Sequence, residues 1–381
     1  MMRWILAFLL LALPALLRAQ PAAPLQGPLL AAAPAAHDRL LIYDVSTGAV
    51  RNLAFGAGWH TVWDFSPDGC RVLFTLGEGL ARLYSARLDG SDRRELARYD
   101  AAPAGSWGVW APRWSPDGTR IAFTFIQGAP RANGVQDHRI AWVEAGGGPV
   151  QFYSVSGDEH EPEWSPDGRW LAYIAFSERV PGADISATAA PTPPGQTGPL
   201  LREADLWMAS ADGATRIRLT DFPTGSVRAP RWSPDGMLIS FIYSPSPGND
   251  QFWMIAAQSG AIPTQLSSRW SLALATTWLP DGSAILAAVR DFRDMPGQFL
   301  WRIPLVGLAD SDASRYLSDE ALNYADYPRF SADGRWLALR SAYALALVDA
   351  VSGAWSLLND TFLGNTPPVW SPVGFQGEAN C

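Results

Sequence analysis

The stretch PRWSPDGTRIAF, which begins at Pro112, recurs along the chain. Further copies keep the same order of aromatic, turn and apolar residues and begin at Trp63, Pro162, Pro230, Thr276 and Pro328. A last fragment, PVWSPVG from Pro368, begins the pattern without finishing it. The copies recur about every 50 residues, a period that predicts a repeat architecture before any single side chain is considered.

One copy of the repeat has the chemistry of a β-hairpin. In the Ser115-Pro116-Asp117-Gly118 turn, Pro presets its φ, Asp bonds back to the backbone and Gly adopts the conformation that a side chain opposes. The residues on either side, such as 120–125, are aromatic and branched and read as strands. Because the second strand is apolar on both faces, we expect sheet packed on sheet.

The length of the repeat predicts an all-β β-propeller, since about 50 residues suit a blade of four strands. Residues 29–33, 40–45 and 49–53 read as the last three strands of a repeat whose first strand is missing. The fragment around Trp370 reads as a first strand alone. Pairing of these N- and C-terminal strands would close the ring and remove exposed sheet edges. We therefore predict seven four-stranded blades, with six as the alternative if the terminal pieces do not pair.

The repeat resembles the TolB-type, WD-repeat-like β-propeller family. The resemblance rests on the WSPDG-x-x-I-A-F pattern, on the strand 206–209 and on Arg218-Leu219-Thr220. It covers residue 29 to the end and concerns the propeller part only, without the small N-terminal domain of TolB. It implies a propeller fold, in a family that includes periplasmic adaptor proteins and propeller domains of peptidases.

The N-terminus has the order of a secretory signal peptide, with Arg3, then an apolar run over 4–17, then small and polar residues. The run is shorter than the ~20 residues of a membrane span, and Pro14 interrupts it. We expect a signal peptide at 1–19, a linker at 20–28 and the propeller at 29–381, with a Pro-rich loop insertion at 177–203. The protein is then periplasmic or extracellular, with no membrane span after signal removal.

Composition and motifs exclude several functions. The formal net charge is -8 and no basic block occurs, which argues against a nucleic-acid partner. The chain has no Gly-x-Ser-x-Gly elbow and no His-Glu-x-x-His helix, so we assign no catalytic residue and no cofactor. His160 stands in Asp158-Glu159-His160-Glu161 and is the candidate metal ligand, but without a second His at ligand spacing we assign no metal.

The binding residues are expected on one face of the ring. Loops that join strand two to three, and one repeat to the next, emerge together and contain nearly all the long segments; we call this side the long-loop face and the opposite side the turn face. Scaffolded loops usually carry binding residues. The long segments are 101–110, 127–138, 177–203, 244–250 and 290–297. The candidate binding residues here and at the channel rim are Trp59, His60, Trp107, Trp110, Asp158, His160, Glu161, Arg228, Tyr324, Asp326 and Tyr327.

A second set of candidates lies one residue before each repeat aromatic. A charge on an innermost strand is tolerable only if it reaches a water-filled channel. The alternating signs suggest ion pairs between neighbours around the channel. This channel ring comprises Asp64, Arg113, Glu163, Arg231 and Arg329, together with the uncharged Thr277 and Val369.

The two cysteines, Cys70 and Cys381, are expected on the turn face near the seam of the ring, where a disulfide would close a very long loop. Two free thiols are the alternative. Taken together, the sequence predicts an exported, monomeric, non-enzymatic propeller that binds a protein or peptide through its long-loop face. The alternative is a glycan-binding or glycan-degrading propeller, similar to oligogalacturonate lyases, either with a metal or without one.

Overall fold

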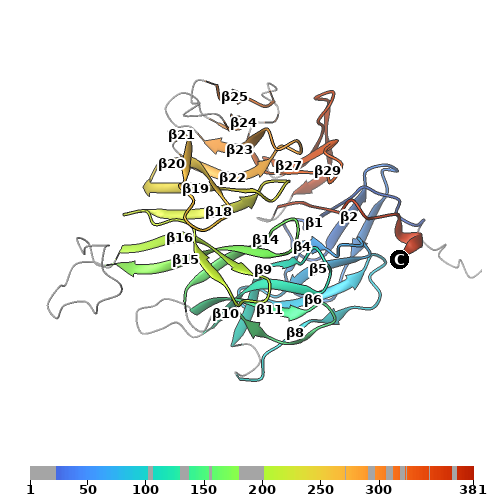
Figure 1. Ribbon diagram of the computed structural model, residues 1–381. Coiled ribbons are helices and arrows are strands. Elements are labelled where there is room, and N and C mark those ends of the chain that lie inside the picture. The colour runs from blue at the N-terminus through green and yellow to red at the C-terminus, as the bar shows by residue number, and fades with distance from the viewer. Residues whose placement is uncertain are drawn as a thin grey trace, which may run out of the picture.

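The protein is an all-β, propeller-like ring, as the sequence predicts (Figure 1). The computed structural model describes residues 23–101, 106–128, 137–153, 157–179, 201–270, 272–290, 297–305, 312–317, 322, 324–342, 344–362 and 367–381. Within these ranges there is no α-helix, and a short 3-10 helix, η2 (Glu378–Asn380), lies near the C-terminus. None of the described helices is long and apolar enough to span a membrane.

Five four-stranded sheets stand apart from one another, and each runs from an outermost strand to an innermost strand at the channel. In that order, the first contains β3 (Val50–Leu53), β2 (Leu40–Asp44), β1 (Leu29–Ala32) and β30 (Val369–Trp370). The second contains β7 (Arg94–Glu95), β6 (Arg82–Arg87), β5 (Arg71–Leu76) and β4 (His60–Phe65). The third contains β13 (Gln151–Phe152), β11 (Asp137–Glu144), β10 (Arg120–Gln127) and β9 (Trp107–Trp114).

The other two separate sheets come from the C-terminal third. One contains β25 (Ser314–Arg315), β24 (Gln298–Pro304), β23 (Ala284–Arg290) and β22 (Leu272–Trp278). The other contains β29 (Trp355–Phe362), β28 (Ala344–Asp349), β27 (Trp336–Ser341) and β26 (Ala325–Phe330). A parallel pair, β8 (Ala97–Arg98) with β12 (Gly148–Pro149), links the outer parts of the second and third sheets.

The remaining strands form one eight-stranded sheet. They are β14 (Glu159–Trp164), β15 (Trp170–Arg179), β16 (Leu201–Ser210), β17 (Arg216–Arg218), β18 (Ser226–Trp232), β19 (Leu238–Ser246), β20 (Asn249–Ala256) and β21 (Thr264–Trp270). Two successive repeats share this sheet because β16 pairs with β18 in parallel at Ala204 and Ser226. The predicted count of seven or six separate four-stranded sheets was therefore wrong, since five stand alone.

Each Ser-Pro-Asp-Gly turn is held by the same small network. In one copy, the Ser165 hydroxyl donates to Asp167 Oδ1 at 2.6 Å and accepts the Trp170 N–H at 3.0 Å. Gly168 has a φ of 69°, which a side chain would oppose. The Ser165 hydroxyl is also the main cause that lowers the pKa of Asp167. Hydrogen bonds between residues of the turn thus hold the two strands of the hairpin in place.

The repeat tryptophans are wedges between neighbouring repeats. The indole N–H of four of them donates to the carbonyl of the channel-ring residue in the preceding repeat, whereas that of Trp114 donates to the Gly118 carbonyl of its own turn at 3.4 Å. The bonds run from Trp164 to Arg113 (3.3 Å), from Trp232 to Glu163 (2.9 Å), from Trp278 to Arg231 (3.0 Å) and from Trp370 to Arg329 (2.9 Å). A tryptophan in this position buries a large apolar area, and its indole N–H still has a hydrogen-bond acceptor.

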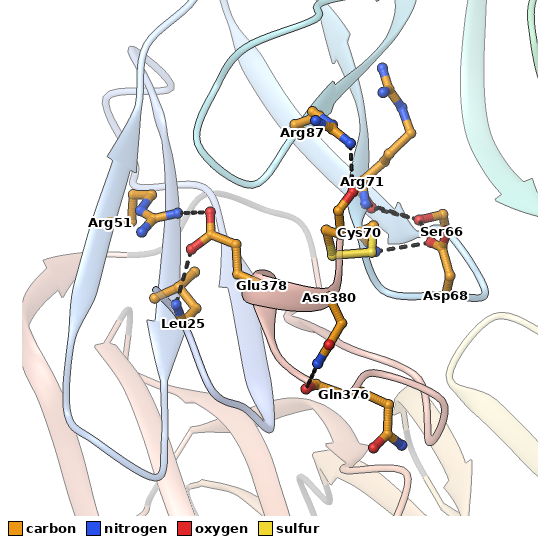
Figure 2. The surroundings of a disulfide bond; sticks show 11 residues. Leu25, Arg51, Ser66, Asp68, Cys70, Arg71, Arg87, Gln376, Glu378 and Asn380 are labelled. Atoms are coloured by element: carbon orange, nitrogen blue, oxygen red, sulfur yellow. Dashed lines mark hydrogen bonds and ion pairs between the residues drawn. A yellow bond between two sulfur atoms is a disulfide. The ribbon is translucent and has the colours of Figure 1, made fainter. Parts of the chain in front are cut away.

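The two ends of the chain meet in one sheet. Leu30 pairs with Trp370 and Ala31 with Val369, and Figure 1 shows the blue N-terminal strands beside the red C-terminal segment. Cys70 and Cys381 form the disulfide, with their Cα atoms 5.3 Å apart. Around it, Glu378 accepts bonds from Arg51 and from the Leu25 N–H (Figure 2). The seam is thus closed by strand pairing, a disulfide and an ion pair.

Parts of the predicted organisation lie outside the described residues. These include the signal peptide at 1–19 and the interior of the 177–203 insertion. Within 20–28, Leu25 is 3% exposed and packs into the core beside β1. The predicted long loop at 244–250 was wrong, because β19 and β20 extend into it and Ser246 pairs with Asn249 around a tight turn.

Candidate functional site

The innermost strands enclose a channel. Each innermost strand contacts the next in the order β4, β9, β14, β18, β22, β26 and β30, and β30 contacts β4, which closes the ring. A hollow of about 450 Å³ lies at the turn-face end of this channel, since the prolines of three Ser-Pro-Asp-Gly turns line it. Its charged lining comprises Arg113, Glu163, Arg231 and Arg329. Asp64 borders an adjoining cavity of about 300 Å³, together with Arg113 and Arg329.

A repeated backbone feature aims the channel arginines. Two residues before each arginine, Ala111, Ala229 and Tyr327 have φ values of 50°, 51° and 50°. At each of these places the register with the second strand shifts, as in a β-bulge. A bulge re-aims the side chains that follow it, and here the arginines that follow line the hollow.

The channel carboxylates join neighbouring repeats by accepting backbone hydrogen bonds from the next repeat. Asp64 accepts the backbone N–H of Trp114 at 2.8 Å, and Glu163 accepts that of Trp232 at 3.3 Å. Burial raises the pKa of Asp64 to about 6, although the Arg113 charge opposes the shift. Of the neighbour pairs expected around the ring, the described residues contain the ion pair between Arg231 and Glu163.

Three predicted rim residues are exposed aromatics on the long-loop face. Trp59 is 47% exposed, Trp110 is 40% and Tyr324 is 50%, and no other described aromatic side chain is as exposed. Trp59 precedes β4, Trp110 lies within β9 and Tyr324 precedes β26, so three innermost strands present them. Trp59 stacks on His37 with ring centroids 4.7 Å apart, which limits its freedom.

Other predicted rim residues are part of the scaffold. His60 and Trp107 are 0% and 1% exposed, so their placement on a binding surface was wrong. The His60 ring is instead used by the backbone, since its Nε2 accepts the Phe55 N–H at 3.1 Å. Sequence alone could not indicate the depth of these two, because each stands where a loop turns into an inner strand.

The charged rim residues also have internal partners. Arg228 pairs with Asp250 at 2.7 Å, and Asp326, 5% exposed, pairs with Arg340 at 2.7 Å. Glu161 accepts the Ala229 N–H at 3.0 Å, which joins two repeats. Tyr327 is half-buried over Arg340, with the guanidinium carbon 4.8 Å from the ring centroid. These residues fix the rim on which the exposed aromatics stand.

A cluster of two histidines and one carboxylate lies on the long-loop face. Asp158 Oδ1 is 3.1 Å from His138 Nδ1 and 2.5 Å from His160 Nε2. The two imidazole rings are 4.4 Å apart between centroids. Burial, followed by the charge of His138, lowers the pKa of His160 to about 4, so this ring is neutral at pH 7. One ligand atom from each residue lies within 4.8 Å of the others, a separation at which they can share a metal ion.

No second histidine stands at ligand spacing from His160 along the chain, but the fold brings His138 beside it. His138 is the second residue of β11, the third strand of one repeat, and His160 lies on β14, the first strand of the next. A signal was present in the sequence, because both histidines were assigned to the same face of adjacent repeats. Spacing along the chain could not reveal the pair, since the contact forms between strands of different sheets.

Comparison with known proteins gives partial matches. No family model matches the chain. It is 28% identical over 144 residues to "Uncharacterized protein Atu1656" of Agrobacterium fabrum, covering 35% of this chain and 45% of that protein. It is 26% identical over 230 residues to "Uncharacterized peptidase YuxL" of Bacillus subtilis, covering 60% of this chain and 29% of that protein. Over 64 residues it is 38% identical to "Tol-Pal system protein TolB" of Alcanivorax borkumensis, covering 17% of this chain and 14% of that protein. The chain thus spans less than half the length of each of these relatives.

Solved structures agree on the fold. A puromycin hydrolase matches with a TM-score of 0.62 and 16% identity, over 90% of this chain and 54% of that one. An oligogalacturonate lyase in complex with manganese matches with a TM-score of 0.54 and 16% identity, over 84% and 81%. At this identity the likeness establishes a shared β-propeller fold, while function depends on the residues of each site.

Proposed function

We propose that this chain, a TolB-type β-propeller, is an exported, non-enzymatic scaffold that binds a protein or peptide through its long-loop face. The observation that carries the proposal is the set of exposed aromatics, Trp59, Trp110 and Tyr324, which lie in or just before three innermost strands. Large aromatics on a rigid surface supply contact area at a low entropic cost and dominate many protein interfaces. The protein acts as a monomer in the periplasm or outside the cell.

The rigidity of the rim supports this proposal. Arg228, Asp326 and Glu161 are held by internal bonds, so the exposed rings stand on a fixed base. A fixed surface loses little conformational freedom when a partner binds. The TolB relative, named as a protein of the Tol-Pal system, is consistent with a role in an assembly at the cell envelope.

The test is a quantitative pull-down from envelope extract with matched variants. Trp59→Ala and Trp110→Ala should each lower recovery of a specific partner at least about tenfold, as hot-spot truncations do. Met237→Ala is the control, because Met237 is apolar and 69% exposed but lies in a turn on the opposite face. Recovery that is equal for all four proteins would overturn the proposal, and fractionation of cells expressing the full chain tests its export.

A second candidate function is favoured by the cluster of His138, Asp158 and His160. Two imidazoles and a carboxylate suit a divalent transition metal such as zinc or manganese. If they hold a metal, its chemistry as a Lewis acid would suit a glycan-binding or glycan-degrading propeller. This candidate is an enzyme or lectin, and it differs from a protein-binding scaffold by its need for a metal.

Metal titration separates the two candidates. After treatment with EDTA, the second candidate predicts stoichiometric uptake of Mn²⁺ or Zn²⁺ that is lost in His138→Gln and in His160→Gln. His37→Gln is the control, because His37 stacks on Trp59 away from this cluster. A protein that takes up neither metal, or takes them up equally in all variants, excludes the metal-dependent function. Cleavage of oligogalacturonate by the loaded protein would then define the substrate.

A further inference from the structure

The channel arginines are held in one repeated pose that leaves most of each guanidinium unused. Nη1 of Arg113, Arg231 and Arg329 donates to the carbonyl of the proline before it, at 3.0, 2.8 and 2.9 Å. A second Nη1 bond goes to the preceding repeat: to the Trp63 carbonyl from Arg113, to the Thr276 carbonyl from Arg329 and to the Glu163 carboxylate from Arg231. The guanidinium is thus anchored at Nη1, and its other N–H groups form no hydrogen bond with the described residues.

Arg329 is the clearest case of an unmatched charge. It lines the hollow, and among the described residues no carboxylate forms an ion pair with it. The Arg231 Nε is buried and has no hydrogen-bond partner in the described part of the chain. Burial, and then repulsion from Arg231, lowers the pKa of Arg329 to about 9. The group is still charged at pH 7, and a nearby anion would relieve the cost of that charge.

The acidic residues of the channel cannot supply this anion. Glu163 is already bonded to Arg231 and to the Trp232 N–H. Asp64 accepts the N–H groups of Phe65 and Trp114 at 2.9 and 2.8 Å. Around the hollow itself, three arginines face one carboxylate, so the lining carries a net positive charge.

The arginines are spread around the hollow. They come from β9, β18 and β26, with β14 between the first two and β22 between the last two. Three separated forks match several separated carboxylates better than they match one compact anion, because each fork pairs two oxygens in its own plane. The tryptophan and proline rings between them, such as Trp164 and Pro166, offer an apolar wall to the carbon skeleton of a ligand. A volume of about 450 Å³ admits a small molecule.

We propose that this hollow on the turn face binds a small molecule that carries two or three separated carboxylates. Arg113, Arg231 and Arg329 pair with the carboxylates, and the Trp and Pro rings contact the carbon skeleton. The site lies at the opposite end of the channel from Trp59 and Trp110. It is therefore independent of the proposed partner surface, and either one can fail without the other.

Calorimetric titration of the full chain with tricarballylate tests the proposal, and the uncharged triamide of the same skeleton is the control ligand. We expect saturable binding of one tricarballylate, a rise in melting temperature and no binding of the triamide. Arg329→Gln should weaken binding at least about tenfold. Arg335→Gln is the matched control, since Arg335 is on the same face but its side chain is 62% exposed. Its affinity should equal that of the unaltered protein.

A second variant covers the case in which Arg329→Gln does not fold. Thr277 lines the hollow, and its hydroxyl forms no hydrogen bond with the described residues, so Thr277→Glu adds a carboxylate without removing a contact. It should abolish tricarballylate binding and leave the fold unchanged by circular dichroism. The proposal is overturned if tricarballylate does not bind, if the triamide binds equally or if Arg335→Gln loses as much affinity as Arg329→Gln. Tighter binding of inorganic phosphate would overturn it too, because it would assign the hollow to a compact anion.

Discussion

The two faces of the ring differ in how far their contacts recur from one repeat to the next. On the turn face, every Ser-Pro-Asp-Gly copy repeats one network, as with Ser115 and Asp117 at 2.6 Å and Ser233 and Asp235 at 2.6 Å. On the long-loop face, hardly any contact recurs: the His138–Asp158–His160 cluster joins one pair of neighbouring repeats, and the pair of Arg228 with Asp250 occurs in another repeat. Repeated contacts build the scaffold, and contacts that occur once mark places where the chain departs from it.

One position on the turn-face side of the channel does not follow the repeat. The turns there keep their backbone from copy to copy, but the residue before each repeat aromatic varies in charge. That variation places three arginines and one glutamate around the hollow. A regular face can therefore carry a specific site when a single position of the repeat is free to vary.

The largest contrast is expected between two tryptophans. Trp164, 8% exposed and bonded to the Arg113 carbonyl, is a wedge between repeats. Trp164→Ala should lower the free energy of unfolding by about 3–5 kcal/mol, because it leaves a cavity. Trp110→Ala on the long-loop face should lower it by less than about 1 kcal/mol, since Trp110 is 40% exposed. Denaturant unfolding measures both, and equal losses would mean that the two faces do not divide scaffold from surface.

The disulfide on the turn face is expected to have the next largest effect. Replacing Cys70 and Cys381 together by Ser should lower the free energy of unfolding by about 2–5 kcal/mol, because the bond closes a loop with a sequence separation of 311. Reductant should lower the melting temperature of the unaltered protein and leave the double variant unaffected. If reductant changes neither, strand pairing and the ion pair of Arg51 with Glu378 hold the seam without the disulfide.

The channel and the long-loop face should respond to pH in opposite directions. The pKa of Asp64 is raised to about 6, so its stabilising contribution is present below pH 3.8 and is lost as pH rises through about 6. The pKa of His160 is lowered to about 4, so its contribution is present above pH 6.5 and is lost as pH falls through about 4. Each effect should be on the order of 1–3 kcal/mol.

Unfolding of metal-free protein between pH 4 and 7 checks both signs. Relative to Asp64→Asn, the unaltered protein should lose stability as pH rises over this range. Relative to His160→Gln, it should gain stability over the same range. Slopes of the same sign for both comparisons would contradict the assigned burial of one of the two groups.

The smallest expected effect belongs to a single turn. Ser165→Ala removes the hydroxyl that bonds Asp167 Oδ1 and the Trp170 N–H, and should cost about 1–2 kcal/mol. Ser352→Ala is the control, since the Ser352 hydroxyl is exposed, accepts the Ala354 N–H at 3.3 Å and has Asp349 as its other partner. A cost no greater than that of the control would show that one turn network contributes little once its neighbours are in place.

Much of the fold could be predicted because it depends on residues that are close together in the sequence. The turn residues, the apolar second strands and the incomplete repeats at the two ends predict hairpins, a ring and its closure between β1 and β30. The Cys70–Cys381 pair followed from the same reasoning, since both residues fall at the seam. Exposure could be predicted in part: Trp59, Trp110 and Tyr324 are exposed on the long-loop face, while His60 and Trp107 are buried.

The sequence by itself determined the repeat, its turns and the face on which each loop emerges, because those properties depend on residues within one repeat. The tertiary structure alone decided the shared eight-stranded sheet, the meeting of His138 with His160 and the gathering of Arg113, Arg231 and Arg329 around one hollow. These contacts join side chains of different repeats. They form only when the ring closes and fixes the angle and depth of each strand, and no spacing along the chain records that geometry.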